Sequence, residues 1–410
     1  MSEFEIVEEE KKKPNQKQIV MEYLKSTESI IHHKGKTYKY VENKYVEQTE
    51  MHLDVRRWLM GKNHPHNTNF VMNMIADIQA IARTHAKEFK TMPFYIGGDD
   101  FPSQIIAYKN GLLDIDKYLT GDNTLIPHTA YWVSTVCLPY EFLPDAVCPK
   151  WHDFLSEVFE DDTGRISLFQ EWCGYCLLPD TSQHKLLCKI GPPRAGKGTT
   201  DRIQQALLGS DNTTGYNLHY LADKFGLVRL IGKYVAFVGE INLANSRDKY
   251  RILETLNSIV GEDEVLIDEK YSSPQSMRLP TRFNLSCNEM PSFVDPSGAL
   301  AERLLLLNFN RSFAGKEDRE LDSKLLTEIS GICNWALAGL TRLRRNGKFS
   351  DTEDLAKTRT EFRRDNSHAY AYLMDCCQIN AGLNPGNLDD IPVSEDTILV
   401  RVSDLEDSYH

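Results

Sequence analysis

A glycine-rich loop between an apolar run and a helical segment is the feature that most constrains this chain. The apolar run Leu186–Ile190 precedes the loop, and residues 201–208 are expected to be helical. A strand, a glycine loop and a helix in this order form a phosphate-binding P-loop. The glycines let successive backbone N–H groups point at phosphate oxygens, and the lysine reaches the β- and γ-phosphates. The predicted nucleotide-binding residues are Gly191, Pro192, Pro193, Arg194, Ala195, Gly196, Lys197, Gly198 and Thr199.

The position after the P-loop lysine departs from the usual pattern. It normally carries a Ser or Thr whose hydroxyl ligates Mg²⁺, whereas this chain has Gly198 there. Thr199 follows one position later. The sequence therefore predicts an ATP and Mg²⁺ site in which Thr199 is the candidate hydroxyl ligand.

Composition describes a large, acidic, globular chain. It has 410 residues, a net charge of −12 and nine cysteines. That length allows two or three domains, and an odd cysteine count fits a reducing cytoplasm better than a disulfide framework. Because no apolar run reaches about 18 residues and the start lacks a signal peptide, no membrane association is expected. The net charge argues against broad non-specific nucleic-acid binding, but it permits a local basic channel inside a ring.

Shifts in pattern along the chain predict six regions. They are a charged, disordered lead-in (1–16), a small α/β region for which a winged helix is one option (17–148), a helical linker or collar (149–180), the P-loop core (181–315), a helical segment (316–380) and a tail (381–410). Within them, periodicity predicts helices over 19–24, 51–59, 70–89, 151–159, 166–177 and 250–260, and strands over 37–46 and 105–114.

Three segments downstream of the P-loop complete an ATPase-like order. The apolar run 234–239 ends at Glu240, as a buried parallel strand does, and an acid at that position can orient Mg²⁺ or activate the attacking water. A second buried run ends at Asn288, whose amide can hold that water. Arg303 opens a further apolar strand over 304–309, and residues 261–271 read as a hairpin. This order predicts an α/β fold with a P-loop ATPase core on a parallel sheet.

At these residues the chain resembles the superfamily 3 helicases of the phage and plasmid primase–helicase type, which are relatives of the AAA+ ATPases. The resemblance implies a hexameric ring that hydrolyses ATP at its subunit interfaces while pulling one DNA strand through its centre. It covers about two thirds of the chain, through the segments 110–114, 172–179, 191–199, 225–233, Glu240, 287–291, 295–303, 331–340 and 346–349.

The resemblance also implies roles for individual residues in ATP hydrolysis. Lys197 would bind phosphate, Glu240 would serve the metal and the attacking water, and Asn288 would be the sensor of the γ-phosphate. Arg303 lies where the family has its arginine finger, which reaches the ATP of the neighbouring subunit. The metal ligands expected on this basis are Thr199 and Glu240.

The DNA contacts implied by the resemblance lie on the predicted hairpin. Lys270 and Tyr271 fall where the family's pore hairpin presents a basic residue to the DNA backbone. The acidic pair Asp268-Glu269 beside them would weaken DNA affinity or pair with Lys270. Arg278 and Arg282 are the next candidates. The expected partners are single-stranded or forked DNA and further copies of this chain.

Two absences refine this hypothesis. No constellation of paired carboxylates with a histidine, as primer synthesis needs, precedes the P-loop. The segment 398–410 resembles the start of a winged helix and then stops. We therefore expect this chain to be a piece of a longer primase–helicase of a phage, plasmid or other mobile element, which would carry a primase or polymerase domain elsewhere.

Two other functions remain open from the sequence. The loop through Gly198-Thr199 is similar to that of adenylate kinases, although about 185 residues precede it here and no arginine-bearing lid is evident. A ring ATPase that loads or remodels without unwinding DNA would carry the same motifs. DNA-stimulated ATP hydrolysis favours the helicase, whereas phosphorylation of AMP favours the kinase.

Overall fold

The computed structural model describes residues 14–83, 92–97, 101–102, 104–239, 241, 247–270, 274–289, 299–316, 318–350 and 360. Glu240, Tyr271 and the segment 398–410 lie outside these residues. The chain divides into two compact units, 1–142 and 143–410, and each is considered by itself. No helix in the described ranges is long and apolar enough to cross a membrane.

The first unit joins three helices to small antiparallel sheets. The helices pack through Val20, Val55 and Met74, which are buried in one apolar cluster. The segment predicted as one strand over 37–46 is a hairpin, because Glu42 and Asn43 adopt positive φ and turn the chain. The predicted helix over 70–89 ends at Ala82. The elements are α1 (Gln16–Ser26), β1 (Ile30–His33), β2 (Lys36–Val41), β3 (Lys44–Glu47), α2 (Met51–Gly61), α3 (Thr68–Ala82), β4 (Phe94–Tyr95), β5 (Ile105–Tyr108), β6 (Gly111–Asp114), α4 (Ile115–Leu119), β7 (Leu125–Ile126) and β8 (Trp132–Val133).

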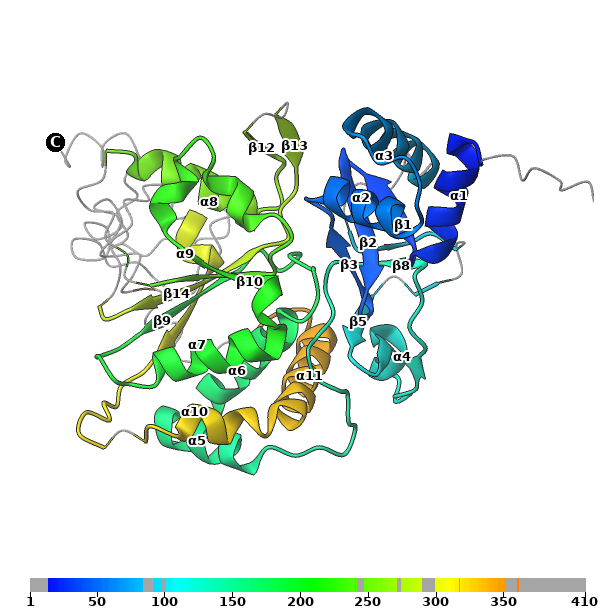
Figure 1. The fold of residues 1–410 in the computed structure, drawn as a ribbon. Helices are drawn as coiled ribbons and strands as arrows, with labels where there is room; N and C mark the ends of the chain where they lie inside the picture. The colour runs from blue at the N-terminus through cyan, green and yellow to red at the C-terminus, as the bar shows by residue number, and fades with distance from the viewer. Residues whose placement is uncertain are drawn as a thin grey trace, which may run out of the picture. The chain divides into compact units, whose positions relative to one another are not determined.

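The second unit is built on a five-stranded parallel sheet (Figure 1). Its spatial order is β10, β11, β14, β9, β15, and each neighbouring pair is parallel. Two of its strands, β11 and β15, are nearly continuous apolar runs, as expected where helices cover both faces. The parallel sheet predicted from the sequence is thus confirmed. Its strands are β9 (Leu186–Ile190), β10 (Thr213–Tyr216), β11 (Val235–Val238), β14 (Arg282–Cys287) and β15 (Leu304–Asn308).

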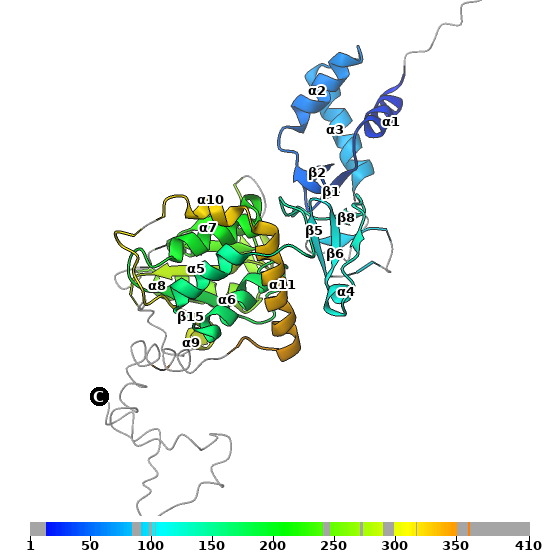
Figure 2. The same ribbon diagram turned by 90° about the horizontal axis from the view of Figure 1, so that it is seen from below.

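Helices cover the two faces of this sheet in separate groups. One face packs against α8 and α9 through a cluster that includes Leu256, Leu300 and Leu285. Figure 2 shows α5, α6, α7, α10 and α11 gathered on the other side, with α6 and α11 adjacent. The bounds are α5 (Pro149–Phe159), α6 (Thr163–Tyr175), α7 (Lys197–Leu208), α8 (Lys249–Val260), α9 (Ala299–Arg303), α10 (Leu321–Leu326) and α11 (Ile329–Asn346), with short 3₁₀ turns at 210–212, 218–221 and 226–230.

Two sequence predictions about the core agree with the structure. The strand expected over 304–309 is β15, and Arg303 directly before it ends α9. The predicted hairpin exists as β12 (Val265–Ile267) paired with β13 (Gln275–Met277). Lys270 lies in the connection between the two strands.

A buried carboxylate joins α6 to the end of α11. Glu171 is 0% exposed. Its Oε1 accepts a hydrogen bond from Arg342 Nε at 2.6 Å, and its Oε2 accepts one from the Ser350 backbone N–H at 2.7 Å. A buried charge is tolerated only when it is paired and hydrogen-bonded, so this contact fixes where the segment after α11 leaves the core.

Removing that carboxylate should destabilise the protein strongly. We expect Glu171→Ala to lower the free energy of unfolding by about 3 kcal/mol, because Arg342 and the Ser350 N–H lose their carboxylate partner. Glu171→Gln keeps the hydrogen-bonding shape and should cost less. Urea unfolding measures both, with Glu254→Ala on the exposed side of α8 as the control. Equal stability of Glu171→Ala and this control would contradict the role of the buried pair.

Candidate nucleotide site

The glycine loop that is predicted to be a P-loop lies at the carboxyl end of β9, where the sheet order changes direction. β9 sits between β14 and β15, yet the chain continues through α7 to β10 at the far edge. Ligands in open α/β sheets bind at such switch points. Gly191 and Gly196 are both required here: a Cβ on Gly191 would lie 2.0 Å from the Phe309 carbonyl oxygen, and Gly196 has φ +95°. The strand, the loop and the helix thus occur in the order predicted from the sequence.

Lys197 and Asn288 meet at this edge of the sheet. Lys197 Nζ donates to Asn288 Oδ1 at 3.2 Å and to the Pro192 carbonyl at 3.0 Å, and it also contacts the Gly191 carbonyl. Partial burial lowers the pKa of Lys197 below its usual value, and the nearby ammonium of Lys189 acts in the same direction. Lys197, at the start of α7, and Asn288, just after β14, thus converge although they are 91 residues apart in sequence.

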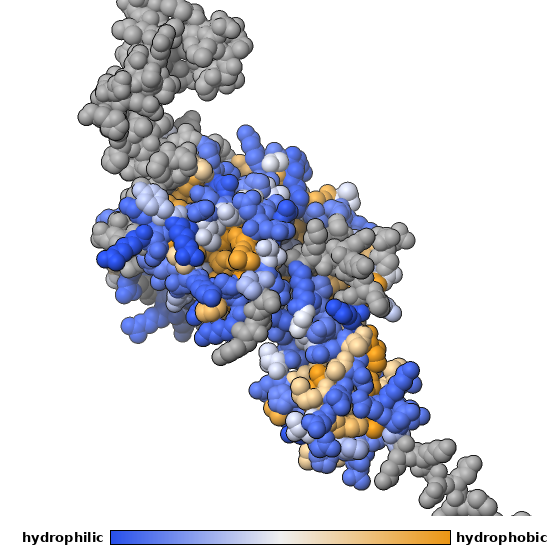
Figure 3. Space-filling model, turned by 90° about the horizontal axis from the view of Figure 1, so that it is seen from above, coloured by the Kyte–Doolittle hydropathy of each residue, from blue (hydrophilic) through white to orange (hydrophobic). Residues whose placement is uncertain are grey.

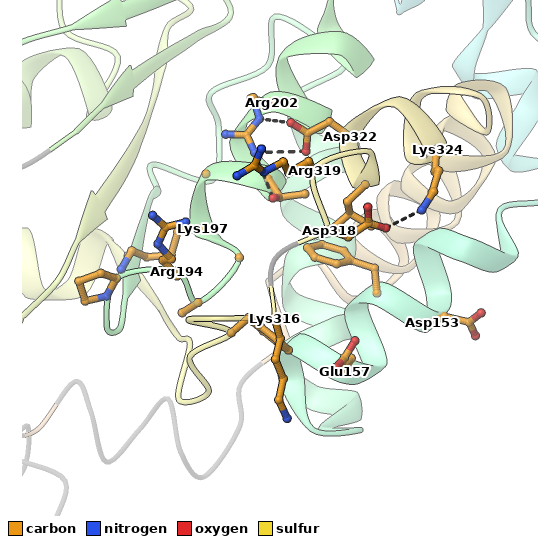
Figure 4. A pocket seen from close by; sticks show the side chains of 18 of the residues that line it. Asp153, Glu157, Arg194, Lys197, Arg202, Lys316, Asp318, Arg319, Asp322 and Lys324 are labelled. Carbon is orange, nitrogen blue, oxygen red and sulfur yellow. Dashed lines mark hydrogen bonds and ion pairs between the residues drawn. The ribbon is translucent and has the colours of Figure 1, made fainter.

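A cavity of about 770 Å³ opens beside these two residues (Figure 4). Its size suits a nucleotide-sized ligand. The floor is the P-loop, one wall is α5, and the other is the segment leading into α10. Cations outnumber acids around it, which favours an anionic ligand. The residues lining it are Lys150, Asp153, Phe154, Glu157, 193–199, Arg202, Asn288, Phe313, Lys316, Asp318, Arg319, Leu321, Asp322 and Lys324.

The wall formed by the segment leading into α10 is held against the glycine loop and α7 by contacts that sequence reasoning missed. Ser312 Oγ donates to the Pro193 carbonyl at 3.0 Å, and the Phe313 N–H donates to the Arg194 carbonyl at 2.9 Å. Arg202, one turn into α7, pairs with Asp322 of α10. The chain separations exceed 100 residues, and no motif spans them. Only the adjacency of β15 to β9 brings these segments together.

The two threonines after Gly198 face different surroundings. Thr200 Oγ1 is turned inward and donates to the Lys197 carbonyl at 2.6 Å. Thr199 lines the cavity, with Arg202 Nη2 3.2 Å from its hydroxyl. Mg²⁺ prefers oxygen ligands and takes only one or two from a protein when phosphates supply others. Thr199 therefore fits the role of a metal ligand, and Thr200 does not.

Arg303 lies away from the P-loop of its own chain. It precedes Leu304, which pairs with Leu186 at the amino end of β9, whereas the P-loop follows the carboxyl end. These ends are separated by about 13 Å at 3.3 Å per residue. Its guanidinium donates to the Asn257 carbonyl. Any contact of Arg303 with a nucleotide therefore involves another copy.

One of the predicted DNA contacts, Lys270, lies beside an exposed aromatic ring that the sequence analysis did not single out. Phe225 is 40% exposed. The ammonium groups of Lys270 and Lys224 lie 5.7 Å and 5.5 Å from its ring centroid. Arg278 is exposed just after β13. Arg282 is excluded as a DNA contact, because it is 1% exposed and donates to the Cys176 carbonyl at 3.2 Å.

Two family models match separate parts of the chain. Residues 11–160 match a family described as D5 N terminal like, and residues 190–303 match a family of unknown function, DUF5906. The first match supports the primase–helicase type of protein that the sequence resembles.

Solved structures share the fold. The A form of the apo NrS-1 C-terminal region is 11% identical, with a TM-score of 0.54 over 86% of this chain and 75% of that one. An apo structure of NrS-1 residues 305–718 is 11% identical, with a TM-score of 0.51 over 90% and 84% of the two chains. At this identity the likeness concerns the fold alone.

Proposed function

We propose that this chain is the ATP-driven motor of a replicative DNA helicase of the superfamily 3 type, built on an AAA+-like P-loop core. The observation that carries the proposal is the contact of Lys197 with Asn288 beside a nucleotide-sized cavity. A lysine for the phosphates and an amide for the attacking water are the groups that phosphoryl transfer to water needs. The D5 N-terminal-like match supports replication as the context.

The proposed roles follow from these positions. ATP would bind with its phosphates on the backbone N–H groups of the P-loop and on Lys197. Thr199, together with Glu240, would hold Mg²⁺, which neutralises phosphate charge when bound. Asn288 would orient the water. A strand-displacement assay on a forked duplex tests the proposal: ATP should support displacement and a non-hydrolysable analogue should not, whereas displacement with neither nucleotide, or no displacement with ATP, would contradict it.

The position of Arg303 supports a ring in which each site is completed by a neighbour. Because an acidic chain repels its own copies, assembly should depend on ligand bridging the interfaces. We expect sedimentation velocity to show hexamers with a non-hydrolysable ATP analogue and smaller species without it. Arg303→Ala should keep the hexamer but lose most turnover. A strict monomer with nucleotide and DNA present would contradict the ring.

The patch of Phe225, Lys224 and Lys270 is the proposed contact with single-stranded DNA. Aromatic rings stack on bases of any sequence, and flanking lysines contact phosphates. Figure 3 shows one face of the protein, which is mainly hydrophilic with some apolar areas. An exposed aromatic ring beside two ammonium groups suits a flexible, negatively charged strand better than a protein partner.

Mutations in this patch should separate stacking from charge. We expect Phe225→Ala to weaken single-strand affinity about tenfold. Lys270→Ala should lower the slope of log K against log salt by about 0.7 for each phosphate that it no longer neutralises. Tyr250→Ala is the control, since Tyr250 is also exposed beside a lysine, Lys249, at 5.4 Å. Fluorescence anisotropy across a salt titration measures these effects. Equal DNA affinity of all variants would show that the DNA contact lies elsewhere.

A further inference from the structure

A lysine is buried in the middle of the sheet, in the strand that leads into the P-loop. Lys189 is 0% exposed and forms an ion pair with Asp201 on α7. Burying two charges carries a large desolvation cost, and apolar residues of similar size often give equal or greater stability. Stability alone therefore does not account for this pair.

The Asp201 carboxylate also receives two hydrogen bonds from β14. Asn284 Nδ2 donates to Oδ1 at 3.0 Å, and Ser286 Oγ donates to Oδ2 at 2.9 Å. Side chains alternate along a strand, so residues 284 and 286 lie on the same side of β14. Asn288 lies in the bend directly after Cys287, the last residue of the strand. Asp201 thus holds the part of β14 from which the chain reaches Asn288.

The other end of the pair fixes the first turn of α7. Lys189 Nζ donates to Thr200 Oγ1 at 3.2 Å and to the Lys197 carbonyl at 3.4 Å. The Thr200 hydroxyl donates to that same carbonyl at 2.6 Å. The backbone of Lys197 is therefore tied to the charge pair that also holds β14.

We propose that Asp201, paired with Lys189, is a positioning residue that keeps Lys197 and Asn288 in catalytic register. Lys197 belongs to α7, and Asn288 follows the end of β14. Asp201 also belongs to α7, and its carboxylate contacts Lys189 of β9 and two side chains of β14. This inference rests on the proposed function, because the register it maintains serves ATP hydrolysis.

Ser286 provides the sharpest test, because its substitution changes no charge. We expect Ser286→Ala to lower kcat for ATP about fivefold, with Kd for ATP and the thermal midpoint unchanged. Ser286→Thr keeps the hydroxyl on a strand-compatible side chain and should restore kcat. Wild-type kcat in Ser286→Ala, or failure of Ser286→Thr to restore it, would overturn the proposal.

A second variant separates position from stability. Lys189→Met/Asp201→Leu replaces the charge pair by an apolar pair, so it should unfold near the wild-type midpoint yet turn over ATP at least tenfold more slowly. If the double variant kept both the wild-type midpoint and the wild-type turnover, the charge pair would serve stability alone, and the proposal would be overturned.

Chemical labelling of Lys197 tests the positioning role without depending on ATP hydrolysis, so it can fail independently of the proposed function. If the wild type binds ATP without hydrolysing it, the proposed function fails, but acetylation of Lys197 by acetic anhydride still reports its contacts. We expect Ser286→Ala to raise the labelling of Lys197 about threefold relative to exposed Lys348 in the same molecule, read by mass spectrometry. An unchanged ratio of Lys197 to Lys348 labelling would overturn the positioning role, whether or not the protein hydrolyses ATP.

Discussion

Lys197→Ala is expected to lower ATP turnover by about a hundredfold or more. The ammonium is the P-loop's cation, and it lies between Asn288 and the Pro192 carbonyl at the mouth of the cavity. Preorganised charge of this kind contributes roughly 10²–10³ in rate when one group is removed. Because the lysine also binds the ground-state phosphates, Kd for ATP should rise as well.

Lys348→Ala is the matched control for this variant. It removes the same charge from an exposed position beyond α11 and outside the cavity lining. A coupled phosphate-release assay and equilibrium binding of a fluorescent ATP analogue measure turnover and affinity separately. If Lys197→Ala hydrolysed ATP as fast as Lys348→Ala, the P-loop would not be the site of hydrolysis.

Glu240→Gln is expected to keep nucleotide binding and stop turnover. Glu240 follows β11 after Gly239, and Val238 pairs with Leu285, three residues before Asn288. Because parallel strands end at the same edge of a sheet, the sequence predicts that an acid following this strand serves the same site as Lys197 and Asn288. Replacement by glutamine removes the charge without changing shape, so we expect kcat to fall about a hundredfold or more.

The expected Kd for ATP of Glu240→Gln is within about threefold of the wild-type value, since carboxylates do not attract phosphates. Glu254→Gln on the exposed side of α8 is the control. Single-turnover hydrolysis after rapid mixing separates the chemical step from product release. Wild-type turnover by Glu240→Gln would refute the assignment of this acid.

Local pattern was sufficient to predict four of the five strands of the second unit's sheet, and β10 (Thr213–Tyr216) was not predicted. The apolar runs before Gly191 and before Asn288 are fully or nearly buried strands, β9 and β14, and the glycine spacing gave the loop between β9 and α7. These features are encoded over a few neighbouring residues. The meeting of Lys197 with Asn288 followed from one further rule, that parallel strands end at the same edge.

Contacts between distant segments could not be predicted in this way. The wall formed by Ser312 and Phe313 depends on β15 lying beside β9, and nothing in the spacing of residues encodes that order. The buried Lys189 looked like an interruption of an apolar run, because its partner Asp201 lies on the next helix. Phe225 could not be identified as part of a DNA contact from the sequence, because its proximity to Lys270 is evident only in the structure.

The alternation of polar and apolar residues also misled the sequence analysis in places. The strand expected over 37–46 contains a turn at Glu42 and Asn43, although neither is glycine. The short helix α9 was not predicted, because its five residues, Ala299–Arg303, are too few to show helical periodicity. Glu240 and Tyr271 lie outside the described residues, and their roles stay predictions.

Steady-state ATP hydrolysis with and without single-stranded DNA tests the central claim most directly. The account predicts slow basal hydrolysis that single-stranded DNA stimulates several-fold, with the stimulation reduced in Phe225→Ala and absent in Lys197→Ala. Adding AMP to the same reaction should yield no ADP beyond that produced by hydrolysis. An ATP hydrolysis rate that does not change when single-stranded DNA is added, or transfer of the phosphoryl group to AMP, would contradict a DNA-translocating motor.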